Sequence, residues 1–129
     1  MTKFFDQLKA RIARIAEQNP AGFTFNPQRG AFADKGYAVA SLDTQDCLGK
    51  AGLFRVIKFY VRHLDYCIGG WRNEDGTMQF DASKIYMNME EAIMAAIRNE
   101  QRAIFNLNTG KVIMAADYNY YLNCTRMAA

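Results

Sequence analysis

Two tight turns between strand-forming residues constrain the fold of this chain more than any other feature of its sequence. The first, at 73–76, reads Asn-Glu-Asp-Gly and separates the segments 66–72 and 77–80. The second, at 108–110, reads Asn-Thr-Gly and separates AIFNL from KVIMA. Asp-Gly, and a glycine closing a three-residue loop, are typical of β-hairpins because glycine adopts the positive φ that these turns need. Neighbouring strands are therefore expected to run antiparallel.

Apolar residues recur at helical spacing in three segments, which predicts three helices. The expected helices span 3–18, 48–64 and 89–100. Thr2 and Asn88 stand just before the first and the third, and both residue types accept hydrogen bonds from the free amides at a helix start. Further strands are expected at GFTFN, at GYAVAS and at KIYM, the last as an extension of the sheet.

The order of these segments, α-β-β-α-β-β-α-β-β, indicates the α+β class. It predicts a mostly antiparallel sheet of about five to six strands, with three helices packed mainly on one face. A length of 129 residues suits one domain, and no linker or repeat divides the chain. The single domain therefore spans 1–129 and begins with the helix within 1–19. The form and order of the Tyr-rich tail, 115–129, stay open.

Cysteine usage and the start of the chain point to the cytoplasm. The three cysteines, Cys47, Cys67 and Cys124, are odd in number and scattered, which is typical of a reducing compartment. His63 is the single histidine, so the usual ligands of a zinc site are missing, and no metal or cofactor is expected. The first residues carry charges every few positions, unlike a signal peptide, and no apolar stretch approaches the ~20 residues of a membrane span.

Charge is distributed unevenly along the chain. The net charge is only +3, but residues 1–64 carry ten lysines and arginines against five acids, whereas residues 65–129 carry six against eight. In the first predicted helix, one sector opposite the apolar stripe holds Lys3, Arg11 and Arg14. In the second, a stripe that no acid interrupts is formed by Arg55, Lys58 and Arg62, with Phe59 adjoining. Such arrays suit nucleic acid, an acidic protein surface or simply a solvated helix face.

No group of residues forms a recognisable catalytic arrangement, so the chain is expected to be a binding protein rather than an enzyme. Cys67 and His63 are the only thiol and imidazole close in sequence, and a buried cysteine near a surface histidine explains them without catalysis. Asp81 could act in acid–base chemistry, or its side chain could cap a turn. No catalytic residue is assigned.

Two groups of aromatic residues are candidates for an interface. Trp71, the sole tryptophan, follows two glycines, which let another backbone approach closely or permit a bulge. Trp71 could be a stacking platform, an interface anchor or a core residue. Tyr118, Tyr120 and Tyr121 in the tail match the tyrosine enrichment of protein interfaces, and could equally cover a sheet edge.

Several motifs, taken in order, resemble a small-protein family of bacterial phages and mobile elements. They are GFT at 22–24, GYAVA at 36–40, the GGW hairpin at 69–81, and the segment 90–110 with EEAI and QRAIF. The resemblance covers roughly residues 20–113. Similar segments also occur as domains of large polyvalent mobile-element proteins. The resemblance implies a setting rather than a reaction, and it supplies no catalytic residue.

The sequence therefore predicts a small phage or mobile-element accessory protein that binds another macromolecule. The expected partner is a host or phage protein, for example a host defence component, and no membrane partner is expected. The alternative is a nucleic-acid-binding domain that uses the two basic helix faces. A small-molecule or nucleotide enzyme without a recognisable motif is the second alternative.

Overall fold

The computed structural model describes residues 2–128, in which helices are interspersed with groups of strands. The helices are α1 (Lys3–Gln18), α2 (Gly49–Tyr60), α3 (Met89–Arg98) and α4 (Tyr118–Ala128), with the short 3-10 helices η1 (Leu42–Thr44) and η2 (Ala115–Asp117). The strands are β1 (Phe23–Asn26), β2 (Ala31–Phe32), β3 (Tyr37–Ala40), β4 (Cys47–Leu48), β5 (Cys67–Arg72), β6 (Met78–Tyr86), β7 (Ala103–Asn106) and β8 (Lys111–Met114). The predicted α+β class is confirmed.

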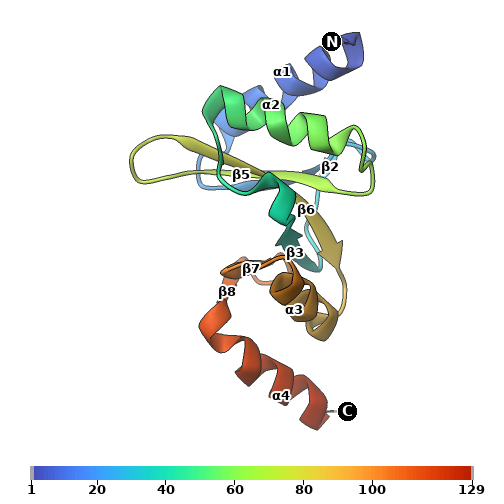
Figure 1. Ribbon diagram of the computed structural model, residues 1–129, viewed down its shortest axis with the longest axis vertical. Coiled ribbons are helices and arrows are strands. Elements are labelled where there is room, and N and C mark those ends of the chain that lie inside the picture. Colours follow the sequence, from blue (N-terminus) through green and yellow to red (C-terminus); the bar gives the residue numbers. More distant parts are fainter. Residues whose placement is uncertain (1, 129) are drawn as a thin grey trace.

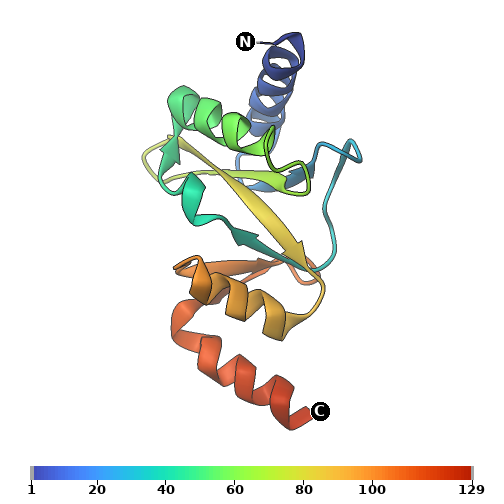
Figure 2. The same cartoon turned by 45° about the vertical axis from the view of Figure 1, so that its right-hand side comes forward.

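All strands pair antiparallel, in the order β2-β1-β5-β6-β3-β7-β8, while the short β4 pairs with the first part of β6. Both predicted hairpins are present as β5–β6 and β7–β8. The strand β3 lies between β6 and β7, so segments far apart in sequence become neighbours. Figure 2 shows β6 running diagonally through the middle of the molecule, where it joins the two halves of the sheet.

The helices build two separate hydrophobic cores. In the first core, α1 and α2 cover β1, β5 and the first half of β6, with Ile12, Ile57 and Ile68 fully buried. In the second core, α3 and α4 pack against β3, β7 and β8, around Val39 and Ile104. Figure 1 shows the two helix pairs at opposite ends of the molecule, with the sheet between them.

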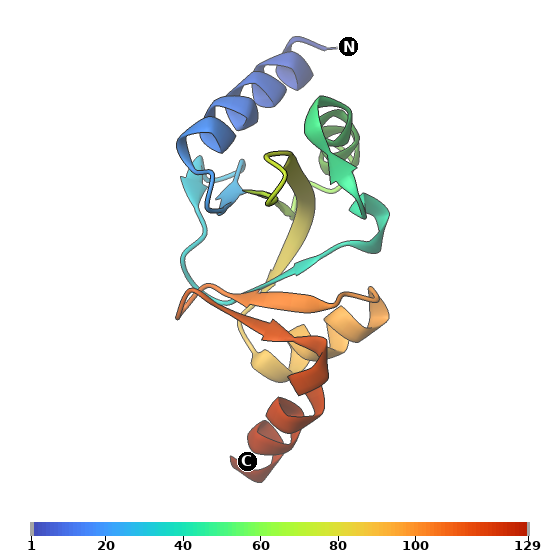
Figure 3. The ribbon, with the colours of Figure 1, turned by 90° about the vertical axis from the view of Figure 1, so that its left-hand side faces the viewer.

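Both helix pairs cover the same face of the sheet. Side chains alternate along a strand, so Phe80 and Tyr86 of β6 point to one face, and each belongs to or packs against a different core. In Figure 3, α1 and α2 lie at one end and α3 and α4 at the other. The sheet therefore curls between the two pairs, and its helix-free face is concave. We call this the concave face.

Alternation and register also define which residues line the concave face. They are Thr24, Ala38, Ala40, Cys67, Gly69, Trp71, Gln79, Asp81, Ser83, Ile85, Ala103, Phe105, Val112 and Met114. The middle of this face is buried by the curl of the sheet, as the low exposure of Cys67 and Ser83 shows.

The structure corrects the sequence-based prediction at four elements. The expected strands at 77–80 and 84–87 are one continuous strand, β6. The short strands β2 and β4 were not predicted, and the tail that had no predicted form contains the helix α4. Residues 2–128 therefore form four α-helices and eight strands instead of three helices and five to six strands. Packing holds α4 in place, because Tyr118 and Leu122 are buried in the second core.

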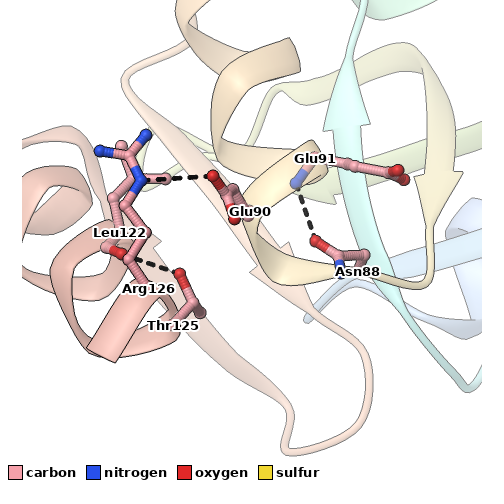
Figure 4. A network of polar contacts seen from close by, with 6 residues as sticks. All are labelled: Asn88, Glu90, Glu91, Leu122, Thr125 and Arg126. Carbon is pink, nitrogen blue, oxygen red and sulfur yellow. Dashed lines mark hydrogen bonds and ion pairs between the residues drawn. The ribbon is translucent and has the colours of Figure 1, made fainter. Parts of the chain in front are cut away.

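The contact between α3 and α4 is shown in Figure 4. The Arg126 Nε lies 3.3 Å from the Glu90 Oε1 and joins the two helices. The Asn88 side chain accepts a hydrogen bond from the Glu91 N–H at 3.0 Å, so the predicted cap of α3 is confirmed. At the other end of the chain Thr2 caps α1, also as predicted, by accepting from the Phe5 N–H at 3.1 Å.

Candidate functional site

A cleft of about 440 Å³ opens on the concave face, beside the β5–β6 hairpin. Strands β3, β5, β6 and β7 contribute to it, together with the segments just before β4 and β7. The lining residues are Ala40, Thr44, Gln45, Asp46, Trp71, Gln79, Asp81, Gln101, Arg102 and Ala103. The volume is within the ~300–1,000 Å³ of small-molecule sites, and the lining is unusually polar for one.

Asp81 is the buried acid of this cleft. It lies in the middle of β6, opposite Gly69 of β5, rather than at a turn. Its relative exposure is 9%, and its Oδ1 accepts a hydrogen bond of 2.7 Å from the Ser83 hydroxyl. Desolvation by burial raises the pKa of Asp81, and the hydrogen bond from Ser83 opposes this shift. A carboxyl group in this environment retains a proton more readily than one in water.

The paired glycines of β5 make room on both faces of the sheet. A Cβ atom at Gly69 would lie 2.8 Å from the Asp81 Oδ1, on the concave face. A Cβ atom at Gly70 would lie 2.8 Å from the ring of Phe23, on the helix-covered face. The glycine pair therefore makes room for two side chains, Asp81 and Phe23, rather than for a bulge or a closely approaching backbone as expected, and one consequence is the enclosure of Asp81.

Trp71 lies at the edge of the cleft. It pairs with Gln79 across the β5–β6 hairpin and stands diagonal to Asp81 on the same face. Its exposed fraction of 38% shows that it is not a core residue, which leaves the stacking and interface interpretations. The Gln79 Oε1 accepts from the Asn73 Nδ2 at 3.4 Å, which orients the amide of Gln79.

The opposite wall comes from the segments that precede β4 and β7. The Gln101 Nε2 donates to the Gln45 Oε1 at 3.1 Å and joins these segments. The Tyr118 hydroxyl donates to the Gln101 carbonyl at 3.0 Å, so α4 supports this wall. Sequence reasoning missed Gln45, Gln101 and Arg102. Gln45 lies outside any motif, the QRAIF motif that contains Gln101 and Arg102 carries no chemical signature, and all three meet the hairpin only through the curl of the sheet.

The six basic residues proposed from the sequence are all exposed, and they lie on two elements, three on α1 and three on or just after α2. On α1, the guanidinium of Arg11 lies 4.8 Å from the ring centre of Phe25 in β1. Phe5 lies on the side of α1 that meets α2, and its ring contacts the ring of Phe54 with 5.4 Å between ring centres. Neither of the ion pairs found within residues 2–128 involves these six basic residues. The six are Lys3, Arg11 and Arg14 on α1, and Arg55, Lys58 and Arg62 on or just after α2.

The three tail tyrosines occupy different environments in α4. Tyr118 is buried in the second core, and its hydroxyl donates a hydrogen bond to the Gln101 carbonyl. Tyr121 is partly buried against the same core. Tyr120 is 66% exposed and is the one of the three with most of its surface free to contact a partner.

His63 and Cys67 lie in unlike surroundings. The His63 ring is exposed and stacks on Phe59, with 4.1 Å between ring centres. Cys67 is buried on the concave face, and desolvation raises the pKa of its thiol to about 11, so the reactive thiolate is disfavoured at neutral pH. Within residues 2–128, no three His, Cys, Asp or Glu side chains are grouped as metal ligands.

A second hollow, of about 500 Å³, lies beside the first turn of α3. Two of its polar side chains already have structural roles, since Asn88 caps the helix and Glu90 pairs with Arg126 (Figure 4). We therefore assign the candidate site to the cleft on the concave face.

The far end of the concave face is apolar. Val112, Phe105, Ala38 and Ile85 form a row across β8, β7, β3 and β6. Phe105, Val112 and Met114 are 38%, 53% and 50% exposed, and we call these three residues the apolar rim. The concave face thus combines a polar cleft at the β5–β6 hairpin with an apolar rim at the β7–β8 hairpin.

The fold and the concave face define an α+β protein with a curled antiparallel sheet and helices on its outer side. Comparison of the chain with family models, with curated proteins and with solved structures finds no match. The resemblance to a phage and mobile-element family therefore stays a prediction. Among the described residues, no helix has the length and apolar character to cross a membrane.

Proposed function

We propose that this chain is a small phage or mobile-element accessory protein that acts by binding another protein through the concave face. The observation that supports this most strongly is the apolar rim. Three large apolar side chains, Phe105, Val112 and Met114, lie on two neighbouring strands with a third to a half of their surface in water. Clustered exposed apolar groups are typical of protein interaction sites.

The surroundings of the rim suit a protein partner. Next to it, Ala38 and Ile85 continue the apolar surface towards the middle of the sheet. Within residues 2–128, β8 is an edge strand with no strand beyond it in the sheet, so a partner strand has free backbone groups to pair with there. The motif resemblance supports the choice of a host protein, such as a defence component, as the partner.

Affinity purification from host cells tests this proposal, with the tagged chain and with nuclease treatment of half the sample. We expect a stoichiometric protein that survives nuclease and is lost with Phe105→Asp. Phe4→Asp is the matched control, because Phe4 is also an exposed phenylalanine but lies on α1. A partner that the Phe105 variant still captures, with both variants folded by circular dichroism, would contradict the proposed interface.

A second candidate function is nucleic-acid binding by α2, which one observation favours. Arg55, Lys58 and Arg62 are exposed, follow one another along a helix side without an intervening acid, and take part in no ion pair within the described chain. Three such cations neutralise up to three phosphates, so log K would fall with log salt by about 0.9 for each phosphate.

This candidate is tested by measuring duplex DNA binding across a salt series. The double variant Lys58→Glu/Arg62→Glu should abolish binding without unfolding the protein, whereas Arg29→Glu, which reverses an exposed charge away from α2, should retain it. Salt-independent binding, or binding that the double variant retains, would remove this function.

A further inference from the structure

The cleft on the concave face brings together four groups that the protein-binding role does not use. They are the aromatic ring of Trp71, the buried carboxyl group of Asp81, the side-chain amide of Gln79, which is hydrogen-bonded to Asn73, and the guanidinium of Arg102. We propose that this cleft binds a guanine mononucleotide, with the base between Trp71 and Asp81 and the phosphate beside Arg102.

Asp81 supplies the contact that selects the base. Its Oδ1 accepts from Ser83, while within residues 2–128 no hydrogen bond reaches its Oδ2. Among residues 2–128 no side-chain oxygen is both fully buried and unpaired, so the Asp81 Oδ2 keeps access to the cleft, where a ligand with N–H groups can donate to it. Among the common bases guanine alone presents two adjacent N–H donors, at N1 and N2, which a carboxylate accepts together.

Trp71 and Gln79 complete the base site. Both project from the β5–β6 hairpin onto the same face as Asp81. An exposed tryptophan ring can stack on a base, as aromatic side chains do in nucleic-acid complexes. Because the Gln79 Oε1 already accepts from Asn73, its Nε2 is the atom left to donate to the guanine O6.

Arg102 distinguishes a nucleotide from an arginine side chain, which offers the same pair of N–H donors. Arg102 lines the cleft and is exposed. Its charge attracts a phosphate, and it opposes the attraction that Asp46 and Asp81, which line the same cleft, exert on a guanidinium ion. The volume of about 440 Å³ also exceeds what a single arginine side chain fills, and it suits a base with its sugar and phosphate.

Fluorescence titration of Trp71, the sole tryptophan, tests the proposal on the full chain. We expect GMP to quench the emission in a saturable way. Asp81→Asn should weaken GMP binding about tenfold or more, since a hydrogen bond to a charged group is lost. Arg72→Gln, which removes a neighbouring exposed arginine outside the cleft, should leave the affinity unchanged.

The choice of ligand separates the roles of the residues. Guanosine should bind more weakly than GMP, and Arg102→Gln should abolish that difference. Equal binding of AMP and GMP would overturn the role of Asp81, and no saturable quenching at millimolar GMP would overturn the site. Tighter binding of N-acetylarginine amide, or of a guanine oligonucleotide, than of GMP would overturn the assignment to a mononucleotide.

Discussion

Asp81 carries an energetic cost at the residue scale, because its charge is enclosed by the sheet. Its pKa in the folded protein is raised above the ordinary value of 3.8. At a pH between the ordinary pKa of aspartate and the raised pKa of Asp81, the folded state binds more protons than the unfolded state. The free energy of unfolding therefore decreases as the pH rises through this range. Above the raised pKa the contribution is constant and unfavourable.

The variant Asp81→Asn keeps the shape of the side chain and an oxygen that accepts from Ser83. We therefore expect it to be more stable than the native protein at neutral pH, with the difference shrinking as the pH is lowered towards the ordinary pKa of aspartate. Urea denaturation at several pH values measures this difference in unfolding free energy. The pH dependence that the other acidic residues contribute cancels in the difference, because both proteins contain them. A native protein that is the more stable of the two at neutral pH would show that the ionised carboxyl stabilises the fold.

Gly69 and Asp81 interact sterically, because the Asp81 carboxyl group occupies the space beside the Gly69 Cα. Gly69→Ala places a methyl group 2.8 Å from the Asp81 Oδ1, and overpacking of this kind costs about 1–3 kcal/mol. In the background of Asp81→Ala the obstructing carboxyl is gone, so the cost of Gly69→Ala should fall by about 0.5 kcal/mol or more. A double-mutant cycle of unfolding free energies measures the coupling, and additive effects would contradict the contact.

At the scale of the element, the strongly periodic segments were predictable and the elements made by tertiary contacts were not. The helices α1 and α3 have apolar stripes and side-chain caps at Thr2 and Asn88, which are local signals. The strand β6 contains Asp81-Ala82-Ser83, residue types that are unfavourable or neutral in strands, and it continues because β5 and β3 pair with it. The cleft was unpredictable for the same reason, since Gln45 and Arg102 reach it only after the sheet has formed.

The helix α4 gives an element-scale prediction. Its sequence, YNYYLNCTRMA, has few strong helix formers, so packing on α3 must stabilise it. Leu122→Ala removes a buried side chain of the second core and should cost about 2–5 kcal/mol. Tyr120→Ala, on the exposed side of the same helix, should change stability by less than about 0.5 kcal/mol. Urea denaturation compares the two, and equal effects would contradict the docking of α4.

At the scale of the whole molecule, β6 links the two cores, and the cysteines report whether they open together. Cys124 is exposed, whereas Cys47 and Cys67 are buried and burial raises the pKa of both thiols. We expect one thiol per chain to react rapidly with Ellman's reagent and two to react slowly. Leu122→Ala, which weakens the second core, should also accelerate the labelling of Cys47 in the first core. An unchanged rate at Cys47 would show that the cores open independently.

The position of β3 in the sheet has a consequence for how the chain folds during synthesis. The side chains of the first core all lie within residues 5–82, so this half has every part it needs before the last third of the chain is made. The strand β3 is made early, yet it pairs with 83–86 and with 105–106. At ~5–20 residues per second, β3 leaves the ribosome several seconds before its second partner does. Once 83–86 has been made, the nascent chain has one finished half and one strand, β3, with a single unpaired edge, which is where a chaperone or a wrong strand would bind first.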